Sequence, residues 1–96
     1  MSRREYDINL YINKLIISKV IIDTHYEEKH SESVDDEIIL SLVRKLNNDT
    51  FEPVDIKEKY QYFVTEKRLN DKNYRLVWLL EDGEVYIGIV NAYRRS

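Results

Sequence analysis

The stretch "YRLVWLLEDGEVYIGIVNAYRR", Tyr74 to Arg95, decides the fold that the sequence predicts. Its first part, Tyr74 to Glu81, is apolar on both faces, which is the pattern of a central strand. Asp82-Gly83 is a strong signal for a tight turn between two strands. The remainder predicts a last strand, in which Gly88 indicates either a bulge or a close backbone approach.

Upstream segments predict three more strands. "KYQYFVTE", Lys59 to Glu66, is rich in aromatic residues, and the loop "RLNDKN" separates it from the central strand. Near the start of the chain, "INLYI" and "LIISKVII" are β-branched runs on either side of Asn13-Lys14. Two such runs around a two-residue break predict a hairpin. Asn-Lys is a weaker turn signal than Asn-Gly, so the register of this hairpin stays open.

One segment, "SVDDEIILSLVRKLNN", predicts a helix from about Val34 to Leu46, with Ser33 as its N-cap. Acidic residues crowd its first turn and basic residues its last turn, and both suit the helix dipole. An apolar stripe with a spacing of four residues runs along it: Val34, Ile38, Leu42 and Leu46. This face is expected to lie on a sheet.

The expected elements follow one another in the order β-β-α-β-β-β. This order predicts an α+β domain with one main helix packed on an antiparallel sheet. The 96 residues contain no repeat and no internal boundary, so we expect a single domain over 1–96.

Composition narrows the function classes. The absence of cysteine excludes a disulfide framework, a thiol nucleophile and thiolate zinc sites, and it fits a cytoplasmic protein. No apolar run is long enough to cross a bilayer, so no membrane partner is expected. The formal net charge of −3 weighs against nonspecific coating of nucleic acid, although it leaves room for a small local basic site.

Both histidines, His25 and His30, lie in "THYEEKHSES", with Lys29 between them. Their spacing places them on different faces of a helix or strand, so no metal site and no cofactor are expected. In a helical turn, His25 and Lys29 would share one face. A histidine beside a lysine suits proton transfer and phosphate binding. The alternative interpretation is a hydrated polar connector.

Polar residues also gather in "NAYRR", where the last strand ends. Asn91 and Tyr93 are expected on one side of the strand and Arg94 on the other, unless a bulge near Gly88 shifts the alternation. Arginine suits phosphate, and tyrosine can stack on a base or donate a hydrogen bond. Alternatively, these residues protect the end of the sheet.

The layout of a His-bearing segment, a short amphipathic helix and a meander ending in "NAYRR" resembles the small bacterial toxins of the RelE/barnase-like ribonuclease superfamily, especially the BrnT-like branch. The resemblance covers roughly His25 to Arg95, with "HYEEKH" and "NAYRR" as its motif-like matches. It implies a metal-independent endoribonuclease that acts on RNA and pairs with an antitoxin-like protein.

On this hypothesis, His25 and His30 are the catalytic base and acid, and Tyr93 stacks on a base or assists proton transfer. Substrate binding is assigned to three further residues: Lys29, Asn91 and Arg94. The alternative hypothesis is a non-enzymatic interaction domain, an inhibitor or adaptor, that uses a tyrosine-rich surface or an edge strand. Eight tyrosines against two phenylalanines favour it, because tyrosine is common at interfaces.

Overall fold

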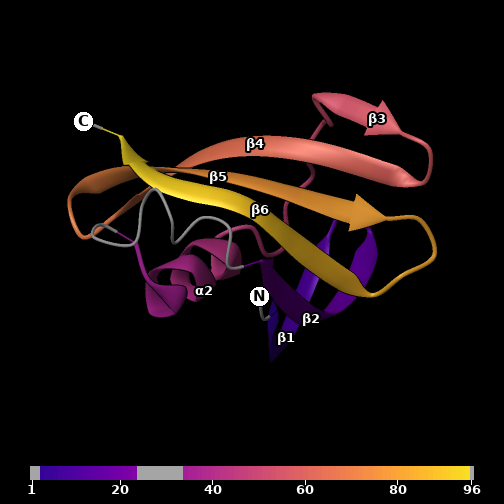
Figure 1. The fold of residues 1–96 in the computed structure, drawn as a ribbon, viewed down its shortest axis with the longest axis horizontal. Coiled ribbons are helices and arrows are strands. Elements are labelled where there is room, and N and C mark those ends of the chain that lie inside the picture. Colours follow the sequence, from indigo (N-terminus) through magenta and orange to yellow (C-terminus); the bar gives the residue numbers. More distant parts are fainter. Residues whose placement is uncertain (1–2, 24–33, 96) are drawn as a thin grey trace.

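A single curved sheet dominates the structure. The computed structural model describes residues 3–23 and 34–95, and 63% of these residues lie in strands. The elements in chain order are β1 (Arg3–Ile12), β2 (Leu15–Asp23), α2 (Asp36–Arg44), β3 (Asp55–Lys57), β4 (Tyr60–Leu69), β5 (Lys72–Glu81) and β6 (Tyr86–Arg95). The strands lie side by side in the order β1-β2-β6-β5-β4-β3 (Figure 1).

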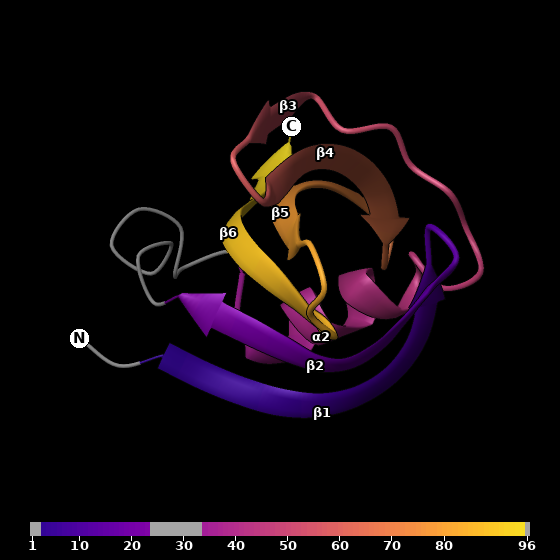
Figure 2. The same ribbon diagram turned by 90° about the vertical axis from the view of Figure 1, so that its right-hand side faces the viewer.

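The predicted fold class, an α+β domain with one main helix packed on an antiparallel sheet, is wrong. The sheet is mixed because β2 pairs with β6 in parallel. The predicted order β-β-α-β-β-β also lacks β3, and α2 has only nine residues. The sheet itself curls around the core and α2 lies within the curve (Figure 2). The parallel pairing joins segments far apart in the sequence, which no local pattern signals.

The first hairpin is confirmed, and its turn fixes the register. Asn13 and Lys14 both have positive φ, 52° and 64°, and Ile12 pairs directly with Leu15. Positive φ at both central residues defines a type I′ turn, whose twist matches that of the flanking strands. Asn70 and Asp71, with φ of 52° and 65°, join β4 to β5 in the same way. The segment predicted as the loop "RLNDKN" therefore belongs mostly to two strands.

The turn at Asp82-Gly83 is also confirmed, in a different form. Gly83 has a φ of 80°, and the Glu84 N–H donates to the carbonyl of Glu81 at 3.1 Å. Asp82 has no positive φ, so this is not a type I′ turn. Residues 82–85 separate the two strands, which leaves room for a looser connection.

A bulge in β6 decides which of its side chains face the core. Val77 of β5 pairs with Asn91 and Trp78 pairs with Ile89, so Val90 is the extra residue. Ile89 before the bulge and Ala92 after it are both buried. The bulge therefore turns Asn91 to the face away from the core, although a regular strand would align it with Ile89.

Helix α2 closes the core from inside the curve. It starts later than predicted because Asp35, and not Ser33, is the N-cap: the Asp35 carboxylate accepts a hydrogen bond from the Ile38 N–H at 2.9 Å. Ser33 lies outside the described residues. Of the predicted stripe, Leu42 and Leu46 are fully buried and Ile38 is half-buried.

Three polar side chains fasten α2 to the edge strand β1. The Arg4 guanidinium donates twice to the Asp36 carboxylate, at 2.5 and 2.7 Å. The Tyr6 hydroxyl donates to the same carboxylate at 2.5 Å, and this hydrogen bond is the main cause that raises the pKa of Tyr6. The helix N-terminus is thereby held by charge-assisted hydrogen bonds as well as by packing.

Trp78 is the centre of the core. The predicted central strand is confirmed, because β5 lies between β6 and β4 and its residues Leu76, Trp78 and Leu80 are buried. The Trp78 ring stacks on Phe63 at 4.1 Å and meets Phe51 edge-on at 5.4 Å. Since Phe51 follows α2 in the chain, these contacts join the sheet to the segment that leads into β3.

Candidate interaction surface

The outer face of the sheet, turned away from the core, carries an apolar band. In its first row, Ile21 pairs with Gly88, Gly88 with Leu79, and Leu79 with Tyr62. The second row contains Val64, Val77 and the bulged Val90. We call these residues the apolar band: Ile21, Tyr62, Val64, Val77, Leu79 and Val90. The exposed face of such a sheet normally carries polar residues, so a band across four strands makes this face a candidate binding surface.

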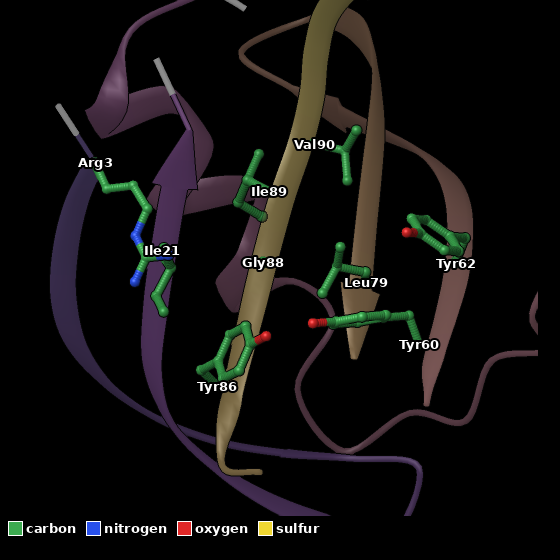
Figure 3. A pocket seen from close by; sticks show the side chains of 9 residues that line it. All are labelled: Arg3, Ile21, Tyr60, Tyr62, Leu79, Tyr86, Gly88, Ile89 and Val90. Carbon is green, nitrogen blue, oxygen red and sulfur yellow. The ribbon is translucent and has the colours of Figure 1, made fainter. Parts of the chain in front are cut away.

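A groove of about 420 Å³ is hollowed into the first row of the band (Figure 3). Its walls come from five strands: Arg3, Ile21, Tyr60, Tyr62, Leu79 and Tyr86. Gly88 forms part of the floor, and a Cβ atom there would lie 2.9 Å from the Leu79 side chain. The missing side chain thus lets Leu79 lie across β6. The volume is in the range of small-ligand pockets, and it also suits a single large side chain.

At one end of the groove, Tyr86 is held by a hydrogen-bonded group of polar side chains. The Tyr86 hydroxyl donates to the Glu81 carboxylate at 2.5 Å, and Lys59 Nζ lies 3.1 Å from its other oxygen. These hydrogen bonds, the one from Tyr86 first, hold the pKa of Glu81 below its usual value. Burial, followed by the bond to Glu81, raises the pKa of Tyr86. Both groups therefore keep their ordinary neutral-pH forms, and neither is tuned toward proton transfer near pH 7.

Beyond the second row of the band lies a cluster of charged groups. Arg75 donates to the Glu66 carboxylate from Nη2 at 2.5 Å and to the Tyr93 hydroxyl from Nη1 at 3.2 Å. Arg95 Nη1 lies 3.5 Å from the same Glu66 oxygen. The hydrogen bond from Arg75 is the main cause that lowers the pKa of Glu66, and Arg95 adds to it. The Glu66 carboxylate thus contacts two guanidinium groups, those of Arg75 and Arg95.

Of the residues predicted to form a catalytic site, His25, Lys29 and His30 lie outside the described residues. Asn91 accepts a hydrogen bond from the backbone N–H of Ala92, and so it supports the bulge. The structure brings Tyr93 together with Arg75 and Glu66 on the outer face.

Arg94 is exposed and pairs in the ladder with Tyr74, whose side chain faces the core. Consecutive strand residues point to opposite faces, so the side chains of Arg94 and Tyr93 leave β6 on opposite faces of the sheet. The two residues therefore do not form one site on the outer face.

The sequence did not indicate the contact between Glu66 and Arg75, although it held a signal. Reading Asn70-Asp71 as a two-residue type I′ turn places Glu66 directly opposite Arg75, as in the structure. The complete groove had no comparable local signal, because Ile21 joins the walls from β4, β5 and β6 only through the parallel pairing of β2 with β6.

Neither a metal-binding cluster nor a membrane-spanning helix is found in the part of the chain that the structure describes. Within residues 3–23 and 34–95, no group of three His, Asp or Glu side chains is placed to hold a metal ion. No helix in these ranges is long and apolar enough to cross a membrane. In comparisons with protein-family models, curated proteins and solved structures, the chain matched none of them.

Proposed function

We propose that this protein is a non-enzymatic interaction domain that binds a partner protein through its apolar band. The observation that carries the proposal is the register of the band, which places aliphatic and tyrosine side chains in two rows on the face opposite α2. Removing such a surface from water favours association by about 25 cal/mol per Å² of apolar area.

The residues around the band support a protein partner. Tyr60 and Tyr86 wall the groove, and Arg75 and Tyr93 flank the second row. Tyrosine and arginine are the residue types that most often dominate binding energy at protein interfaces. A nucleic-acid partner fits less well, because aliphatic residues form most of the band and the net charge of the chain is −3.

The sheet edges are protected, which points to the face as the binding surface. Edge strand β3 has only three residues and follows Pro53. Edge strand β1 starts with charged residues and is interrupted by a register shift between Asp7 and Leu10. Short length, proline, charge and bulges are the usual devices that prevent a strand from pairing with another chain.

Site-specific photo-crosslinking tests the proposal. A photoreactive amino acid replaces Val64 in the band or, as a control, Ile16, which is 68% exposed at the tip of the first hairpin. In an extract of the source cells, the Val64 variant should yield a discrete adduct with another protein. Adding Leu79→Glu should abolish that adduct. Equal adducts from both positions, or none from Val64, would count against the band.

Endoribonuclease activity remains a second proposal, favoured by the charged cluster in which Arg75, Arg95 and Tyr93 lie together at one end of the sheet. Guanidinium groups suit phosphate binding. The test is incubation of the purified protein with mixed RNA in EDTA, beside a His25→Ala, His30→Ala double variant. Cleavage should have a bell-shaped pH profile and vanish in the double variant. A flat profile, or undiminished cleavage, would contradict the histidine assignment.

A further inference from the structure

Positive charge is in local excess beside the second row of the band. Glu66 is the one carboxylate that Arg75 and Arg95 share there. Arg75 donates to Glu66 from Nε and Nη2, and its Nη1 donates to the Tyr93 hydroxyl. Arg95 is 43% exposed and, among the described residues, makes only its 3.5 Å contact with Glu66. Since a guanidinium has five N–H donors, most of those on Arg95 are available to a partner.

The groove and the charged cluster that contains Arg75 and Arg95 lie at a fixed distance from each other. Leu79 in the groove wall and Arg75 in the cluster are both on β5, four residues apart. At about 3.3 Å per residue, the two points are separated by about 13 Å along the strand. A bound segment that uses both must therefore carry two different chemical groups at that spacing.

We infer, on the basis of the proposed function, that the partner presents an acidic segment with an apolar anchor. The anchor side chain enters the groove over Gly88, and a carboxylate about 13 Å away pairs with Arg95 and Arg75. That distance corresponds to about four residues of extended chain or about nine residues of helix. Glu66 supplies one negative charge for the two guanidinium groups, and the partner's carboxylate supplies the second through charge-assisted hydrogen bonds.

Selection from a displayed library of random 16-residue peptides tests this inference. Against the wild-type protein, selected peptides should be enriched in Asp and Glu, with a bulky apolar residue about four or about nine positions away. Against an Arg75→Gln, Arg95→Gln double variant, the acidic enrichment should fall to the input frequency while the apolar preference stays. Against Gly88→Val, which fills the groove floor, the apolar preference should be lost.

Binding of one selected synthetic peptide then gives the size of the effect. Arg95→Gln should weaken it about 10- to 100-fold, the loss expected for a charge-assisted hydrogen bond. The exposed control Ile16→Thr should leave the affinity unchanged. Thermal unfolding followed by circular dichroism checks each variant, and Leu79→Ala replaces Gly88→Val if the latter does not fold.

Some outcomes would overturn the inference alone, and one would overturn the proposed function with it. Neutral or basic peptides that still depend on Gly88 would show that the band binds protein but not an acidic segment. A dimer in sedimentation that Leu79→Glu dissociates would assign the band to a second copy of the chain. If the same peptides are selected against the wild-type protein and against the arginine and groove variants, and crosslinking at Val64 fails, the apolar band is not an interaction surface.

Discussion

Replacement of Trp78 by leucine tests whether the aromatic cluster is the centre of the core. Trp78 is fully buried, stacks on Phe63, meets Phe51 edge-on, and donates from Nε1 to the Thr65 hydroxyl at 3.2 Å. Each ring pair contributes about 0.5–1.5 kcal/mol beyond burial, and the hydrogen bond about 1 kcal/mol. We therefore expect Trp78→Leu to lower the free energy of unfolding by about 2–4 kcal/mol.

The measurement is urea unfolding followed by far-ultraviolet circular dichroism, because the variant lacks the only tryptophan of the chain. A matched control is Val54→Ala at a position that is 65% exposed, where the change should stay within about 0.5 kcal/mol. The double variant Phe63→Leu, Trp78→Leu should lose less than the sum of its single variants, because both remove the same stacked pair. A loss below about 1 kcal/mol for Trp78→Leu would refute the central role of the ring.

Three further predictions concern the helix, the last turn and pH. Leu42→Ala should cost about 2–5 kcal/mol in urea unfolding, because the side chain is fully buried; a cost under about 1 kcal/mol would mean that the helix face is loosely packed. Gly83→Val should destabilise by about 1–2 kcal/mol through its positive φ alone, since nothing lies near an added Cβ, and Gly83→Asn should cost less. Hydrogen bonds hold the pKa values of Glu66 and Glu81 below 4.5. Their stabilisation is therefore present above about pH 4.5 and lost as the pH falls through the lowered values, so the urea midpoint should drop there, and less in Glu81→Gln. The pKa of Tyr6 is raised above 10, so its stabilisation is lost in the opposite direction, as the pH rises past 10; an unchanged midpoint would contradict this.

Local patterns in the sequence were sufficient for much of the fold. The β-branched runs around Asn13-Lys14 predicted the first hairpin, and the apolar run around Trp78 predicted the central strand. The predicted helix agrees with α2 within two residues at each end. It starts later than predicted because Asp35, and not Ser33, is the N-cap. In each of these cases the deciding interactions join residues close in sequence.

The arrangement of the sheet could not be read in the same way. The parallel pairing of Ile21 with Gly88 depends on the packing of distant strands, and the fold class was wrong for that reason. The abundance of tyrosine indicated a surface of some kind, but only the paired strands place Tyr60, Tyr62 and Tyr86 around one groove. A site formed by long-range pairing has no fixed spacing in the sequence to reveal it.

The position of β6 also has a consequence for synthesis of the chain. This strand is the last of the described strands to be made, yet it lies between β2 and β5. Until it emerges from the ribosome, the first hairpin has no neighbour on its β2 side, and the apolar interior of the curve stays open to water. The pairing of β2 with β6 closes a long loop, and this step is slow because the chain must lose conformational entropy before the contacts between the two strands form. The nascent chain is thus exposed to aggregation until a late stage, and a ribosome-associated chaperone that shields the β2 edge should raise the yield of folded protein.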